Sequence, residues 1–174
     1  RAISEELPRS GGMEDHMAIR NIRIMGDPVL SKTAKEVDGV TPRIRQLILD
    51  MLDTMYEAGG VGLAAPQVGI LKRIVVIDVT PEGNSPIVLI NPVIVESSGK
   101  QIGDEGCLSL PGKAGVVTRP NYVKVKAYDI NMREVIYEGT ELLARAFCHE
   151  LDHLDGHMYV EKVEGSLHDT QAES

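Results

Sequence analysis

Residues 141–156 read ELLARAFCHELDHLDG, and the rest of the chain can be organised around them. Apolar side chains recur at helical spacing, which predicts a helix over residues 141–155 that ends at the final glycine. In this helix His149 and His153 are four residues apart and project from the same face. Two imidazoles at this spacing can chelate one metal ion, and Glu150 is placed to act on a metal-bound water.

Glu150 lies within the apolar half of this predicted helix. A carboxylate there costs stability unless a partner compensates its charge. The polar sector of the helix holds Glu141 and Arg145, where we expect an ordinary surface pair between residues four apart. A glutamate that shares a buried sector with two histidines therefore favours a metal site over a chance HExxH pattern on a solvated helix.

A catalytic divalent metal needs a third protein ligand and one open position. Downstream residues do not supply that ligand, because His157 is too close and faces elsewhere and Glu161 and Glu164 follow the end of the helix. A free cysteine is most often a small buried hydrophobic residue. Cys148 points about 120° away from the middle of the two histidines, which leaves Cys107 as the candidate third ligand.

Upstream, helical periodicity predicts another helix over residues 42–56, with Thr41 as its N-cap. A loop of small residues follows at 60–67. Strands are predicted for the β-branched runs at 73–79, 87–91, 93–96, 116–118, 122–128 and 134–138. No helix long enough for a parallel crossover lies between these runs, so we expect antiparallel meanders and an α+β fold.

The chain carries 18 lysines and arginines against 26 aspartates and glutamates, a net charge of −8. This balance argues against direct nucleic-acid binding, which needs an excess of cations. The longest apolar run is far shorter than the ~20 residues of a membrane helix. Two cysteines do not make a disulfide framework.

The ends of the chain differ from its middle. Residues 1–16 are polar, lack the apolar core of a signal peptide, and are interpreted as a remnant of cloning. We expect a single catalytic domain over residues 17–163 and a polar tail over residues 164–174 that frays. Without a targeting segment, the expected compartment is the cytoplasm.

Three stretches resemble the signature motifs of bacterial peptide deformylases: GVGLAAPQ at 60–67, EGCLS at 105–109 and HELDHLDG at 149–156. They occur in the order typical of the family, and the resemblance extends from about Ala18 to Val163. It implies a fold of antiparallel β-sheets packed around a central helix that carries the HExxH motif. It also implies an enzyme that removes the N-formyl group from the initiator methionine of nascent polypeptides and releases formate.

The resemblance also implies roles for individual residues. Cys107, His149 and His153 correspond to the metal ligands. Glu150 corresponds to the general base that takes a proton from the metal-bound water and passes it to the leaving amine.

Gln67 and the backbone N–H of Leu108 correspond to the donors that stabilise the oxyanion of the tetrahedral intermediate. Glu105 and Arg119 correspond to an ion pair that steadies the cysteine loop. Three residues correspond to those whose backbone binds the substrate main chain: Val61, Gly62 and Gly106.

By family implication the metal is Fe(II), one per chain. Zn(II), Ni(II) and Co(II) also suit two imidazoles and a thiolate and are expected in purified protein. The implied partners are formyl-methionyl nascent peptides, with possible transient proximity to the ribosome. The chain departs from many relatives at Lys113, Ala114 and Arg145, which puts the side-chain preference beyond methionine in question.

Two alternatives differ from this interpretation. An HExxH metallopeptidase would cleave peptide bonds and usually takes a third ligand downstream of the helix. A structural metal site would pin the helix to the sheet and would normally close all four coordination positions. Cys107 and the lack of a fourth candidate ligand argue against both.

Overall fold

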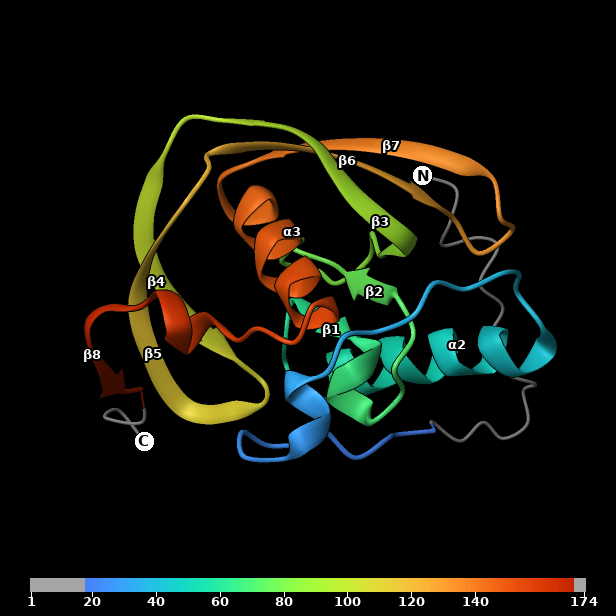
Figure 1. The fold of residues 1–174 in the computed structure, drawn as a ribbon, viewed down its shortest axis with the longest axis horizontal. Coiled ribbons are helices and arrows are strands. Elements are labelled where there is room, and N and C mark those ends of the chain that lie inside the picture. Colours follow the sequence, from blue (N-terminus) through green and yellow to red (C-terminus); the bar gives the residue numbers. More distant parts are fainter. Residues whose placement is uncertain (1–17, 171–174) are drawn as a thin grey trace.

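The structure is a computed structural model that describes residues 18–170, with helix α3 (Glu141–Leu154) between two antiparallel sheets (Figure 1). The sheets have the strand orders β1-β2-β3-β6-β7 and β4-β5-β8. The strands are β1 (Gly62–Ala64), β2 (Ile74–Ile77), β3 (Ile87–Ser98), β4 (Gln101–Cys107), β5 (Leu110–Arg119), β6 (Tyr122–Tyr128), β7 (Glu134–Thr140) and β8 (Glu164–Asp169). The expected α+β fold with antiparallel sheets is confirmed, and residues 149–153 lie in α3. Residues 1–16 lie outside the described part.

Helix α2 (Pro42–Glu57) begins as the sequence predicts. The Thr41 hydroxyl accepts a hydrogen bond from the N–H of Ile44 at 3.1 Å, and Pro42 occupies the first turn. Its apolar side packs with strands β1 and β2 in one hydrophobic cluster. Three short 3₁₀ helices complete the set: Pro28–Ser31 (η1), Ala65–Val68 (η2) and Tyr159–Lys162 (η3).

Helix α3 is stopped by Gly156, as expected. This residue has φ +82°, and a Cβ atom on it would lie 2.6 Å from the carbonyl oxygen of Ser31. Both the left-handed backbone and the close approach of Ser31 favour glycine here. The helix end is thereby fixed against the N-terminal part of the chain.

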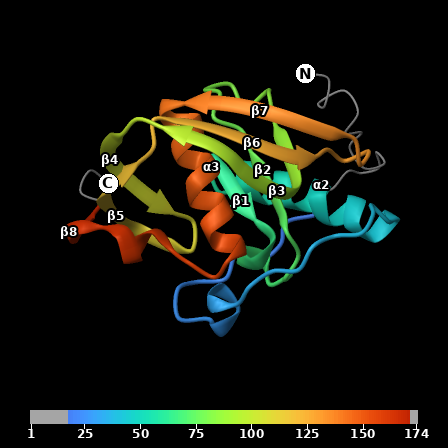
Figure 2. The ribbon, with the colours of Figure 1, turned by 45° about the horizontal axis from the view of Figure 1, so that its top comes forward.

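Figure 2 shows α3 with the five-stranded sheet on one side and the three-stranded sheet on the other. Its apolar face packs against the larger sheet, where Phe147 and Leu154 join Val75 and Val125 in a second hydrophobic cluster. The smaller sheet covers the part of the polar sector around Arg145, whereas Glu141 and Asp155 remain exposed. Arg145 is therefore only 7% exposed, and the expected surface pair with a glutamate on its own helix is wrong.

Strand β1 lies in the segment expected to be a loop, β3 joins the runs predicted at 87–91 and 93–96, and β5 begins at Leu110 rather than at residue 116. Two further strands differ from the sequence-based expectations. Strand β4 was not predicted, because its QIGDEGC sequence contains two glycines and two acids. Strand β8 lies in the segment expected to fray, yet it pairs antiparallel with β5, with Ala114 opposite His168. Strands β4 and β8 both form because each pairs with β5. Strand formation depends on neighbouring strands more than on local propensity.

Within residues 18–170, none of the helices is both long enough and apolar enough to cross a membrane.

Candidate active site

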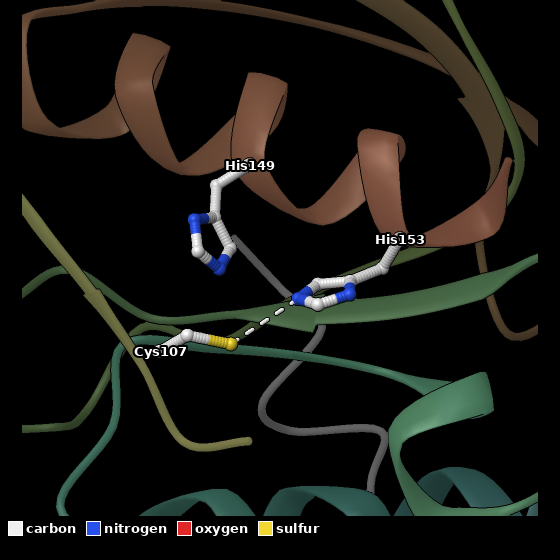
Figure 3. Close-up of side chains that lie close together, drawn as sticks. All are labelled: Cys107, His149 and His153. Atoms are coloured by element: carbon white, nitrogen blue, oxygen red, sulfur yellow. Dashed lines mark hydrogen bonds between the residues drawn. The ribbon is translucent and has the colours of Figure 1, made fainter. Parts of the chain in front are cut away.

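Three side chains from two elements meet beside α3 (Figure 3). His149 and His153 project from successive turns of the helix, and Cys107 is the last residue of β4. One candidate ligand atom from each residue lies within 4.8 Å of the others. The Cys107 Sγ lies 3.3 Å from Nε2 of His153. The structure thus brings together the three residues that the sequence grouped.

The chemistry of this trio fits a divalent transition metal. Two imidazole nitrogens and one sulfur suit zinc, iron, cobalt or nickel. Burial, reinforced by neighbouring His149, lowers the pKa of His153 to about 3, so its imidazole is neutral and has a lone pair to donate. Among residues 18–170 nothing hydrogen-bonds to its Nδ1. Three protein ligands leave a position for a reacting molecule.

His149 is oriented by a buried carboxylate. Its Nδ1 lies 2.8 Å from Oε1 of Glu105, so the ring N–H donates to the carboxylate and Nε2 remains to bind a metal. Burial alone would lower the pKa of His149, but the Cys107 sulfur and the Glu105 carboxylate outweigh it and raise the pKa. A cation at this site must therefore displace a proton, and its affinity rises with pH.

Glu105 is held by two arginines as well as by this histidine. Arg119 donates to both of its oxygens, from Nε at 2.8 Å and from Nη2 at 2.9 Å. Nη1 of Arg145 donates to Oε2 at 2.8 Å. Burial would raise the pKa of Glu105, but the hydrogen bonds from Arg119 and His149 prevail and hold it well below its usual range. The carboxylate is ionised at any physiological pH.

Glu150 carries a buried oxygen without a partner. The residue is 4% exposed, and no described residue hydrogen-bonds to its Oε1. Burial raises the pKa of Glu150 to about 7, and the negative charge of Glu105 acts in the same direction. A Cβ atom on Gly62 would lie 2.5 Å from Oε2 of Glu150, so this glycine lets strand β1 approach the carboxylate. Such a group can accept and return a proton near neutral pH.

The side chain of Gln67 places its amide nitrogen beside Cys107. Its Oε1 accepts a hydrogen bond from the N–H of Ala64 at 2.9 Å, which fixes the side-chain amide. Its Nε2 donates to Oγ of Ser109 at 3.1 Å and lies 3.6 Å from Sγ of Cys107. The amide can therefore act as a fixed donor beside the trio.

A cleft of about 590 Å³ opens over these groups. Strand β1 lies on one side of it and β4 on the other, and each is the edge strand of its own sheet. The predicted site residues that line the cleft are Val61, Gly62, Gln67, Glu105, Gly106, Cys107, Leu108, His149 and Glu150. Two edge strands that border one cleft can accept an extended peptide between them.

Arg119 and Cys148 lie away from the cleft. Arg119 reaches the site only through Glu105, and it also donates to Asp152 at 2.9 Å. Cys148 is buried outside the trio, and burial raises the pKa of its thiol to about 11. Its thiol is therefore protonated and poorly suited as a ligand or nucleophile.

The sequence does not reveal three contacts around the site. Arg145 lines the cleft, as its departure from relatives suggests, but the sequence gives no sign of its hydrogen bond to Glu105. Ser109 supports Gln67 across the cysteine motif. The ring of Tyr159 stacks on His149, with centroids 5.9 Å apart and planes at 30°. None of the three contacts follows a spacing that a sequence reveals.

Comparisons with known proteins give a consistent result. The family model described as "Polypeptide deformylase" matches residues 19–168. A peptide deformylase of Lachnoclostridium phytofermentans is 71% identical over 153 residues, which cover 88% of this chain and 94% of the relative. One of Agathobacter rectalis is 69% identical over 157 residues, covering 90% of this chain and 98% of the relative.

Solved structures agree with these relatives. A peptide deformylase from Legionella pneumophila superposes with a TM-score of 0.82 at 44% identity, covering 84% of this chain and 87% of that structure. One from Synechococcus elongatus, in complex with actinonin, has a TM-score of 0.80 at 45% identity, covering 85% of this chain and 80% of that structure.

Proposed function

Since the chain belongs to the polypeptide deformylase family and is an enzyme of that family, we propose that it removes the N-formyl group from the initiator methionine of nascent polypeptides and releases formate. One observation carries most of the weight: Glu150, whose buried Oε1 has no partner among the described residues, lines the same cleft as Cys107 and His149. The substrates are formyl-methionyl nascent peptides, with transient proximity to the ribosome, and the proposed compartment is the cytoplasm.

The cofactor we propose is one divalent cation per chain, natively iron(II), held by Cys107, His149 and His153. When bound, the cation supplies Lewis acidity that polarises the formyl group and makes water a better nucleophile. Support comes from the donor set and from Glu105, which turns Nε2 of His149 toward the site.

Glu150 is the proposed general base. Its carboxylate takes a proton from the attacking water as the water oxygen bonds to the formyl carbon. The same proton is then given to the amine nitrogen as the carbon–nitrogen bond breaks, which yields formate and a free amino terminus. A pKa of about 7 suits both the acceptance and the return of this proton.

Gln67 and the backbone N–H of Leu108 are the proposed donors to the oxyanion of the tetrahedral intermediate. Ala64 fixes the amide of Gln67, so its Nε2 is directed before the substrate arrives. Preorganised donors of this kind cost no rearrangement when the charge develops. Leu108 lines the same cleft, directly after Cys107.

We propose that the peptide binds as an added strand between β1 and β4. Backbone groups of Val61 and Gly62 lie on one edge, and those of Gly106 lie on the other. Recognition through main-chain hydrogen bonds tolerates many sequences after the first residue, as an enzyme that acts on many nascent chains requires.

The test is the release of formate from formyl-Met-Ala-Ser, compared with the unformylated Met-Ala-Ser. We expect formate and a free amine in equal amounts from the first peptide and no product from the second. Cleavage of a Met–Ala or Ala–Ser bond would instead indicate a metallopeptidase. No reaction with either peptide in metal-loaded protein would indicate a structural metal site.

A further inference from the structure

Arg145 is a buried arginine with three anchored contacts. Its Nη1 donates to Oε2 of Glu105 at 2.8 Å and to the carbonyl oxygen of Val117 at 3.1 Å. Its Nε donates to Oε1 of Gln101 at 3.3 Å. The residue is 7% exposed. Taking a guanidinium out of water is costly, so such a residue is stable only where its charge and donors are matched this closely.

The local backbone makes room for this guanidinium. A Cβ atom on Gly103 of β4 would lie 3.4 Å from Nη2 of Arg145. Arg145 and His149 are four residues apart on α3, so both side chains leave the same side of the helix. Both meet the carboxylate of Glu105 on the facing strand.

The carboxylate of Glu105 accepts two hydrogen bonds on each oxygen. Oε1 accepts from His149 and Arg119, and Oε2 accepts from Arg119 and Arg145. Arg119 holds the carboxylate through a planar fork and is itself anchored by Asp152 at 2.9 Å. Arg145 adds a further bond to Oε2 from α3, the same helix that carries His149, whereas Arg119 lies on β5.

From these contacts we propose that Arg145 is a positioning residue for the metal centre. It fixes the carboxylate of Glu105, and Glu105 fixes the ring of His149. The inference rests on the proposed role of His149 as a ligand. Partners that orient a ligating histidine typically affect metal affinity by about 10- to 100-fold, although Arg145 itself touches no candidate ligand atom.

The test measures metal binding rather than turnover. Zn(II) dissociation constants are measured by competition with a chromophoric chelator for the full chain, Arg145→Leu, Arg145→Lys and Phe147→Leu. Phe147 is fully buried on the same helix and lies in the apolar cluster, so Phe147→Leu reports the effect of destabilising α3 alone. Thermal unfolding of the metal-free proteins ranks their stabilities.

We expect Arg145→Leu to bind Zn(II) about 10-fold more weakly than the unchanged chain. Arg145→Lys should recover part of this loss, because it restores a cationic donor for Oε2 of Glu105. Phe147→Leu should lower the melting temperature but bind within about twofold of the unchanged chain. The Co(II) absorption spectrum should change for Arg145→Leu and stay the same for Phe147→Leu, since only the first variant alters the ligand geometry.

Equal affinities for Arg145→Leu and Phe147→Leu would overturn the proposal, whether both are weakened or both are unchanged. If Arg145→Leu does not fold, Arg145→Gln replaces it under the same criterion, because glutamine is polar but too short to reach Glu105 in the same geometry. Because zinc affinity is measured without substrate, this result is independent of whether formate is released.

Discussion

Oε1 of Glu105 and Nδ1 of His149 lie 2.8 Å apart across the interface between strand β4 and helix α3. This contact joins the two elements that carry the metal trio, because β4 ends in Cys107 and α3 carries both histidines. It fixes the tautomer of His149 and holds the cysteine strand against the helix. The geometry of the site therefore depends on sheet–helix packing as much as on the HExxH spacing.

Cys107→Ala should lose most of its metal and nearly all activity, whereas Cys148→Ala should retain both. Only Cys107 places its sulfur beside the histidines, and the thiol of Cys148 is buried elsewhere. Metal content after gel filtration and formate release measure the two effects. Equal losses in the two variants would show that the assignment of the third ligand is wrong.

Glu150→Gln should keep its metal and lose turnover. Glutamine has nearly the same size but cannot accept a proton, and general base catalysis typically contributes about 10²–10⁴-fold. The loss should appear in kcat with little change in KM, because the base acts on the way to the transition state. A variant that keeps most of its turnover would exclude Glu150 as the base. Loss of the metal would make it a ligand.

The stability of the metal-free protein should fall as pH rises through the range set by Glu150. The pKa of this residue is raised by burial from 4.5 to about 7 in the folded chain. Below 4.5 the group is neutral in both states, and its full stabilising effect is present. Between these two pH values Glu150 ionises readily only in the unfolded chain. The free energy of unfolding therefore falls by up to about 3 kcal/mol.

Thermal melts of metal-free Glu150→Gln and the unchanged chain test this pH dependence. The variant should be the more stable protein at about pH 8, and its advantage should shrink toward about pH 4. Because the charge of Glu150 also raises the pKa of His149, the difference reports the titration of this coupled pair. A stability difference that is constant with pH would contradict the raised pKa.

Gln67→Leu should lower kcat by about 10²–10³-fold and leave the metal content unchanged. The change removes the fixed amide donor but none of the three candidate ligands. Ser109→Ala is the matched control, because it deletes only the hydroxyl that accepts from Nε2 of Gln67. We expect a smaller loss for Ser109→Ala. Similar activity in Gln67→Leu and the unchanged chain would exclude the oxyanion role.

Protein loaded with iron(II) should lose activity in air. Iron(II) and the Cys107 thiolate can both be oxidised. Protein in which Ni(II) or Co(II) replaces the iron before exposure to air should be active and stay active in air. Iron-loaded protein that stays active in air for hours would count against this expectation.

The two long helices could be predicted from the sequence because their signals are local. Thr41 and Pro42 mark the start of α2, and Gly156 marks the end of α3. The HExxH spacing placed His149 and His153 on one face for the same reason. Such signals depend on residues within one or two turns of each other.

Features that depend on distant partners could not be predicted in this way. Strand β4 forms because it pairs with β5, although its glycines and acids are poor strand formers. Arg145 is a charged residue in the polar sector of its helix, which is typical of a surface position. It is buried because the smaller sheet packs over it. The hydrogen bond from Arg145 to Glu105 therefore cannot be predicted from the spacing of residues in the sequence.

The most direct test of the account titrates metal-free protein with Ni(II) and measures formate released from formyl-Met-Ala-Ser. We expect no formate without metal and a rate of formate release that rises until about one Ni(II) per chain has been added. For Cys107→Ala we expect no rise at any ratio of Ni(II) to protein. Full activity without metal, or a metal-loaded chain that releases no formate, would contradict the account.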